Sequence, residues 1–151
     1  MDSSSHQGEG KNNIPEIKTN SPSKPSKEQI INQARKLHKE GNILKAEKYY
    51  QYCINQGFND HRVFSNYGVI LRNLGNLEDA VLSTRKAIEL KPDYAKTYSN
   101  LGLILSDLGK SQEAFDSYLK SIEINPTVSD IYTSITSFLK SMFSIICRYS
   151  W

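Results

Sequence analysis

An asparagine recurs at three positions spaced 34 residues apart, and its side-chain amide is suited to binding a peptide backbone. The three are Asn32, Asn66 and Asn100, and Ser134 occupies the next position of the series. Each amide can donate a hydrogen bond to a carbonyl and accept one from an N–H group. Asparagine in a helix interior lowers helix propensity, so its recurrence has no local reason. The column therefore predicts a site that holds an extended peptide by its main chain. Packing or capping of neighbouring loops is the alternative.

Basic and apolar side chains accompany this column. A groove lined by cations would favour acidic or extended peptides, although scattered Lys and Arg are also typical of a solvated surface. The candidate peptide-binding groove consists of Asn32, Arg35, Arg62, Asn66, Val69, Arg72, Lys96, Asn100 and Leu103.

The sequence contains no residue combination that is typical of catalysis. We find no nucleophile–base pair, no Gly-rich phosphate loop and no metal-ligand set. Gly41, Gly75 and Gly109 are isolated and are expected to end helices. Cys53 falls on an apolar helix face, where a small buried side chain is the favoured interpretation. We therefore predict that the chain is not an enzyme and binds no cofactor or metal.

The elements that position the asparagines repeat with the same 34-residue period. Within 61–74 and 77–90, apolar residues recur at spacings of three and four, which predicts two helices per unit. Asn76 is expected to cap the second helix of the pair, and Asp93 the helix after it. Gly68 and Ala80 lie where two helices of a pair could cross closely. Residue types that recur at this offset include Gly68 and Gly102, Gly75 and Gly109, Ala80 and Ala114, and Pro92 and Pro126.

The recurring types also follow a known order of aromatic, Leu-Gly, aromatic and Ala positions. They occur as Phe64, Tyr67, Gly68, Leu71, Ala80, Thr84, Ala87 and Pro92, and again as Tyr98, Leu101, Gly102, Leu105, Ala114, Tyr118, Ser121 and Pro126. This pattern resembles the tetratricopeptide repeat. The resemblance implies an all-α fold, a right-handed α-solenoid of stacked antiparallel helix pairs, with three repeats and one extra helix. It also implies that partners bind the concave groove lined by the first helices.

The asparagine column is similar to that in the repeat domain of O-linked N-acetylglucosamine transferases and SPINDLY-like proteins. Some members of the wider family bind a C-terminal carboxylate with a clamp of Lys and Asn. Ile31 and Ser65 replace polar residues of that clamp here, so we do not predict binding of chaperone tails.

The predicted organisation is a tail, a repeat domain and a second tail. Ser26 and Gln29 form the pattern of a capping box at the start of the first helix. The polar segment before it cannot bury enough apolar surface to order itself. The apolar C-terminal segment departs from the repeat and indicates truncation or divergence of a longer repeat protein. The predicted parts are a disordered tail 1–26, a repeat domain 27–142 with units 27–60, 61–94, 95–128 and a partial unit 129–142, and a tail 143–151.

Composition and charge argue against two classes of function, and the resemblance to the tetratricopeptide repeat implies binding of another protein. The net charge of +3 over 151 residues is too small and too evenly mixed to indicate nucleic acid. No apolar run approaches the roughly 20 residues of a membrane span, and the expected location is the cytoplasm. We predict a protein- or peptide-binding scaffold. The alternatives are the substrate-recruiting part of a larger glycosyltransferase or sulfotransferase whose catalytic domain is absent, and a module that self-associates through 138–151.

Overall fold

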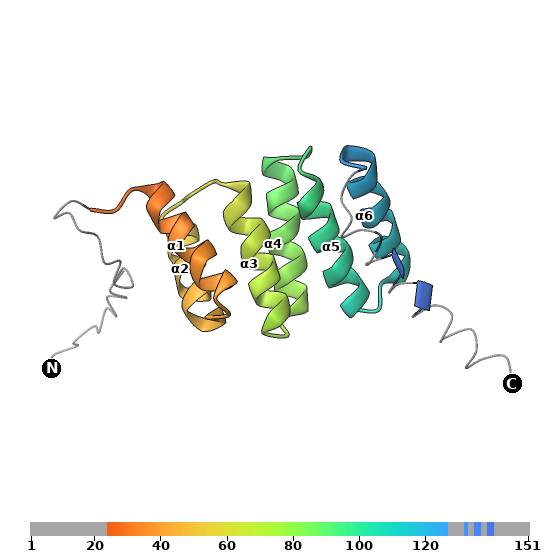
Figure 1. Ribbon diagram of the computed structural model, residues 1–151, viewed down its shortest axis with the longest axis horizontal. Helices are drawn as coiled ribbons and strands as arrows, with labels where there is room; N and C mark the ends of the chain where they lie inside the picture. Colours follow the sequence, from red (N-terminus) through yellow and green to blue (C-terminus); the bar gives the residue numbers. More distant parts are fainter. Residues whose placement is uncertain (1–23, 127–131, 133–134, 137–138, 141–151) are drawn as a thin grey trace, which may run out of the picture.

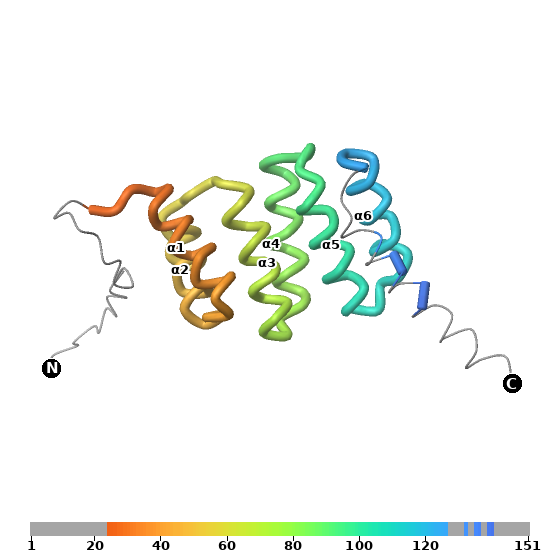
Figure 2. Tube along the Cα trace, viewed as in Figure 1, coloured from red at the N-terminus to blue at the C-terminus, as the bar shows by residue number. Residues whose placement is uncertain are grey.

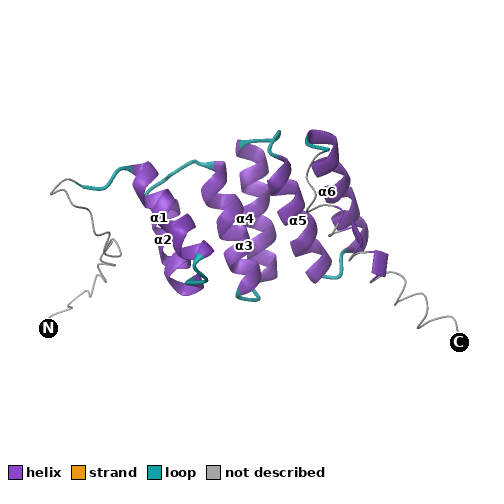
Figure 3. Ribbon diagram, in the orientation of Figure 1, coloured by secondary structure: helices purple, strands orange, loops and turns teal. Residues whose placement is uncertain are grey.

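The chain forms three helix pairs that stand side by side in chain order (Figure 1). The structure is a computed structural model that describes residues 24–126, 132, 135–136 and 139–140. Helices and turns account for all of this described part, with no strand in it (Figure 3). The helices are α1 Lys27–Lys39, α2 Ile43–Asn55, α3 His61–Asn73, α4 Leu77–Leu90, α5 Ala95–Asp107 and α6 Ser111–Ile124. The predicted all-α solenoid of helix pairs is thereby confirmed.

Glycine ends the first helix of each pair in the predicted way. Gly75 has φ 82°, in the left-handed region, and the following Asn76 N–H donates to the Leu71 carbonyl at 2.9 Å. Together with a bond from the Leu74 N–H at 3.1 Å, this bond satisfies the Leu71 carbonyl at the end of α3. Gly41 and Gly109 take φ values of 75° and 73° at the equivalent turns. The turn within each pair is therefore set by local sequence.

The helix starts only partly follow the sequence-based prediction. The capping box of α1 is confirmed, because Ser26 Oγ accepts from the Gln29 N–H and Gln29 Oε1 accepts from the Ser26 N–H. Asn76 occupies the N-cap of α4 but makes no side-chain capping bond. The prediction for Asp93 is wrong, because α5 begins one residue later and Tyr94 occupies its N-cap. Packing against neighbours, rather than side-chain capping, must position these later helix starts.

In the second and in the third pair, the two helices cross so closely at a glycine that no larger side chain fits there. A Cβ at Gly68 would lie 2.2 Å from Thr84 Oγ1 and 3.1 Å from the Ala80 carbonyl oxygen. At Gly102 it would lie 2.5 Å from Cε1 of Tyr118. The predicted crossing of Gly68 with Ala80 is thus confirmed. In the third pair the nearest neighbour of the glycine is an aromatic ring.

The first helices of the pairs lie on the inside of a curved stack. Within 24–126, α1 contacts α3 and α3 contacts α5, whereas α2 makes no contact with α4, nor α4 with α6. Figure 2 shows the trace of this stack. Two hydrophobic clusters fill it, one around α1 and α2 and one around α5 and α6, and Tyr67 packs against both. The inner face is therefore built from α1, α3 and α5.

Several predictions fall outside the described residues. The N-terminal tail before residue 24 and the C-terminal tail 143–151 lie there entirely. Of the extra helix predicted at 129–142, the structure describes five residues, all helical, and Ile135 packs against the cluster around α5 and α6. None of the described helices is both long and apolar enough to cross a membrane.

Candidate binding groove

A cavity of about 390 Å³ opens on the inner face between α1, α3 and α5. Side chains of these three helices form its walls, and Tyr50 of α2 contributes to its floor. Six of the nine residues predicted from the sequence line it. The full lining is Arg35, His38, Lys39, Tyr50, Arg62, Ser65, Asn66, Val69, Tyr94, Lys96 and Asn100.

The other three predicted residues lie elsewhere. Asn32 lines a neighbouring depression on α1, where its Oδ1 accepts a long hydrogen bond of 3.4 Å from Arg35 Nη1. Arg72 forms an ion pair with Asp107 at 2.5 Å, which joins α3 to α5. Leu103 is half-buried and packs against the cluster around α5 and α6. The asparagine column is thus interrupted at its first member.

The last asparagine of the column is committed to an internal hydrogen bond. Asn100 is buried, and its Nδ2 donates to Ser65 Oγ at 3.1 Å. The buried hydroxyl of Thr97 lies 3.3 Å from the same oxygen. A hydroxyl oxygen can take part in several such bonds, so this small network fixes α5 against α3. For Asn100, the packing alternative raised by the sequence describes the geometry well.

Asn66 differs from Asn100, because the positions one repeat before Ser65 and Thr97 hold apolar residues. Subtracting 34 from Ser65 and Thr97 gives Ile31 and Val63, both fully buried and without hydroxyl groups. Asn66 therefore finds no hydroxyl partner on α1 and lies half-buried at the cavity wall. Its amide can serve a ligand in the cavity, whereas the amide of Asn100 already uses one of its two N–H donors on Ser65.

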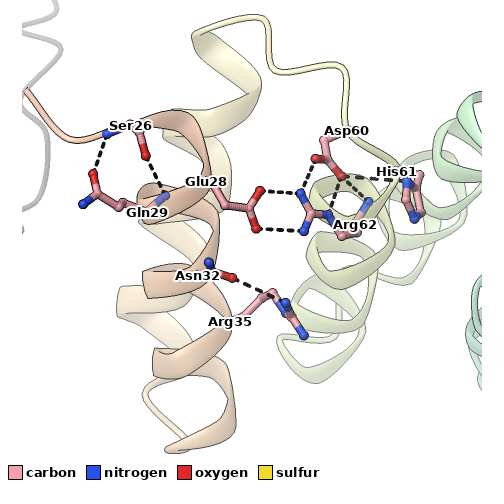
Figure 4. A network of polar contacts seen from close by, with 8 residues as sticks. All are labelled: Ser26, Glu28, Gln29, Asn32, Arg35, Asp60, His61 and Arg62. Atoms are coloured by element: carbon pink, nitrogen blue, oxygen red, sulfur yellow. Dashed lines mark hydrogen bonds and ion pairs between the residues drawn. The ribbon is translucent and has the colours of Figure 1, made fainter.

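Arg62 is neutralised by two carboxylates at the edge of the cavity (Figure 4). Its guanidinium donates to both oxygens of Glu28 on α1, at 2.9 and 2.7 Å, and to Asp60 at 3.1 and 2.8 Å. Asp60 also accepts from the Arg62 N–H and so caps α3. The bonds from Arg62 lower the pKa of both carboxyl groups. This network joins the first two pairs and leaves little of the Arg62 charge for a ligand.

Three other cations keep their charge available. Lys39 and Lys96 form no ion pair with any described residue, and Arg35 bonds only the neutral Asn32. Burial, and secondarily Lys96, lower the pKa of His38, so this imidazole is neutral at pH 7. No Asp or Glu is among the described lining residues. The cavity is therefore an electropositive pocket suited to an anion.

The hydroxyl of Tyr50 is the one buried side-chain polar atom, among those that the structure describes, without a hydrogen-bond partner. The residue is fully buried, yet it contributes to the cavity lining. Burial raises the pKa of this phenol, while the charge of Arg35 and the nearby Asn66 amide act in the opposite direction. Asn66 is thus close, but not in hydrogen-bonding geometry. An unsatisfied buried hydroxyl lowers the stability of the folded chain.

Sequence reasoning missed five lining residues: His38, Lys39, Tyr50, Ser65 and Tyr94. Lys39 lies four residues after Arg35, one helical turn further along the same face, and this spacing could have identified it. Tyr50 belongs to an apolar stripe and indicated only core packing. Its ring does pack in the core, and the residue also belongs to the lining of the cavity, with its hydroxyl shielded from solvent.

Two overlapping parts of the chain match protein families. Residues 68–109 match the family described as "TPR repeat", and residues 95–128 match "Tetratricopeptide repeat". No curated protein matches the chain. The resemblance of the asparagine column to transferase repeat domains stays a prediction.

Solved structures share the fold at low sequence identity. The "Crystal structure of MamA" aligns with TM-score 0.70 and 20% identity, covering 78% of this chain and 68% of that one. The "Arabidopsis OM64 TPR domain" aligns with TM-score 0.70 and 17% identity, covering 76% and 94%. The "First TPR of Spaghetti (RPAP3) bound to HSP90 peptide SRMEEVD" aligns with TM-score 0.70 and 19% identity, covering 77% and 92%. At these identities the likeness is one of fold.

Proposed function

Because this chain belongs to the tetratricopeptide-repeat family, we propose that it is a scaffold that binds a segment of another protein in the inner-face cavity. The observation that carries the proposal is the lining of that cavity. It combines the half-buried amide of Asn66 with available cations and contains no carboxylate among the described residues. The RPAP3 repeat domain with an HSP90 peptide shows that a domain of this fold can hold a short acidic peptide.

The finer proposal is that the bound segment is extended and acidic. Asn66 would hydrogen-bond its main chain, since an amide offers both a donor and an acceptor. Arg35, Lys39 and Lys96 would attract its acidic side chains. The role is binding without catalysis, in the cytoplasm. Recruitment of a substrate protein for a larger transferase would use the same cavity.

A peptide-display selection against the whole chain tests this proposal. We expect enriched peptides to be acidic, and Asn66→Ala and Lys96→Gln to weaken their binding while helicity by circular dichroism stays unchanged. Asn73→Ala and Lys48→Gln are the matched controls, because both residues are exposed and lie outside the cavity lining. Enriched peptides that bind the cavity variants and the unaltered chain equally would show that the cavity is not the binding site.

A further inference from the structure

The cavity combines two features that acidic-peptide binding alone leaves unused. The first is the unpartnered Tyr50 hydroxyl at its floor. The second is the number of its available cations, since Arg35, Lys39 and Lys96 face no carboxylate in the described lining. Figure 4 shows Arg35 extending from α1 toward α3, away from the network around Arg62. Both features point to an anion with more charge and more acceptor atoms than a single carboxylate has.

The two kinds of anion that a peptide carries differ in the number of charges and oxygens. A carboxylate has one charge and two oxygens. A phosphoryl group carries about −1.5 to −2 charges at pH 7 and three acceptor oxygens. Three cations around one carboxylate would leave an excess of positive charge at the mouth of the cavity, where Arg35, Lys39 and Lys96 are exposed, and the Tyr50 hydroxyl would compete with them for two oxygens. A phosphoryl group offers an acceptor to the hydroxyl and to the cations together, and Arg clusters bind such groups in other proteins.

Neutral His38 strengthens this distinction. Burial and, secondarily, the charge of Lys96 lower the pKa of its imidazole, and both side chains line the cavity. Arg62, by contrast, is saturated by Glu28 and Asp60. The anion would therefore lie between Lys39, Lys96 and Arg35, above Tyr50 and beside Asn66.

We propose that this cavity binds the phosphoryl group of a phosphorylated residue in the partner peptide, and that the Tyr50 hydroxyl donates a hydrogen bond to it. This inference rests on the proposed function, because it requires a peptide in the same cavity. It adds that binding is switched on by modification of the partner.

Three peptide libraries with a fixed central residue test the proposal. The central residue is phosphoserine, glutamate or serine, with random residues on either side, and binding is measured by fluorescence polarisation on the whole chain. We expect the phosphoserine library to bind about tenfold or more tightly than the other two, because charge-assisted hydrogen bonds are the strong ones. Excess inorganic phosphate should compete with the bound peptides more effectively than acetate at equal ionic strength.

Variants of the lining residues test whether the phosphoryl group binds in this cavity. Lys39→Gln, Lys96→Gln and Tyr50→Phe should each reduce the preference for phosphoserine about tenfold. Lys48→Gln and Tyr52→Phe are the matched controls, because Lys48 is exposed, Tyr52 is buried, and neither lines the cavity. Circular dichroism and the melting temperature identify any variant that unfolds. The variants that remain folded then decide whether this cavity recognises the phosphoryl group.

Two results would overturn the proposal in distinguishable ways. Equal binding of the phosphoserine and glutamate libraries, with sensitivity to Lys96→Gln retained, would refute phosphoryl recognition and leave acidic-peptide binding in place. Failure of all three libraries to bind would refute both the phosphoryl site and the peptide-binding function. A preference for phosphoserine that Tyr50→Phe, Lys39→Gln and Lys96→Gln all leave intact would place the phosphoryl group outside this cavity.

Discussion

The boundary between the first two repeats and the boundary between the last two are built from equivalent positions but differ in their polar contacts. Between α3 and α5, Ser65 bonds Asn100 and Thr97, and the buried amide is satisfied. Between α1 and α3, the position of Ser65 is held by Ile31, and Asn66 faces a cavity. The hydroxyl of Thr84 donates to the Ala80 carbonyl, whereas that of Tyr50, 34 residues earlier, has no described partner.

This difference shows how a regular array can carry one specific site. An internally satisfied boundary contributes stability, because leaving a buried polar group unpaired is unfavourable. An unsatisfied boundary forgoes part of that stability and keeps its donors for a ligand. The repeat departs from its own pattern at Ile31 and Tyr50, and the proposed binding site lies there.

The close crossing of α3 with α4 gives the largest expected effect. Gly68→Leu should lower the free energy of unfolding by about 3 kcal/mol, because the added side chain meets Thr84 and the Ala80 backbone. Ala34→Gly, at the equivalent place in the first pair, should lower it by about 1 kcal/mol through the flexibility of glycine. Urea unfolding followed by circular dichroism measures both. A loss for Gly68→Leu no larger than that for Ala34→Gly would show that the crossing of α3 with α4 has room for a side chain.

The polar contacts between α3 and α5 give the second-largest expected effect on stability. Ser65→Ala removes the acceptor of Asn100 and should lower the free energy of unfolding by about 1–2 kcal/mol, because the buried amide loses its partner. Asn66→Ala should change it by less than about 0.5 kcal/mol, since its amide has no such internal bond. The same urea titration measures both. A larger loss for Asn66→Ala than for Ser65→Ala would mean that the two boundaries are satisfied alike.

The unpartnered hydroxyl predicts a gain in stability. Tyr50→Phe should raise the free energy of unfolding of the free chain by about 1 kcal/mol, because an unsatisfied buried group is removed while the ring is kept. Thr84→Val, at the equivalent position, should give no gain, because its hydroxyl is bonded. Thermal and urea unfolding provide the measurement. A loss of stability in Tyr50→Phe would reveal a partner for the hydroxyl in the folded chain.

The carboxylates around Arg62 predict the smallest effect, a change in pH dependence. Their pKa values are lowered in the folded chain from ordinary values of 4.5 for Glu28 and 3.8 for Asp60. Their stabilisation is therefore fully present above about pH 4.5 and is lost as the pH falls through the lowered values. Arg62→Gln should flatten this dependence.

Urea titrations between pH 2.5 and 6 compare this variant with Lys96→Gln. Lys96 occupies the equivalent position in the third repeat and has no described carboxylate partner, so Lys96→Gln should keep the slope of the unaltered chain. Glu28 is exposed and screened by solvent, which keeps the effect small. Equal slopes in all three proteins would show that the network does not bias folding.

The sequence was sufficient to predict the helix pairs, their turns and most of the cavity lining. Helices follow from apolar spacing, and turns follow from glycines that tolerate a left-handed backbone. The prediction at Asp93 was wrong because the start of α5 is set one residue later, at Tyr94. Arg72 and Leu103 were placed in the groove although Arg72 pairs with Asp107 and Leu103 packs in the core. A partner on another helix, such as Asp107 for Arg72, is not revealed by spacing along one helix.

The sequence by itself determined the 34-residue period, and the period determined which helices share the inner face. The turns and the apolar stripes within each repeat are local features, because each depends on residues a few positions apart. Only the tertiary structure decided which asparagine forms an internal bond, which arginine is neutralised, and that Tyr50 lines a cavity with its hydroxyl unpartnered. These outcomes depend on the distance between side chains of different repeats, and that distance is fixed only when the pairs pack together.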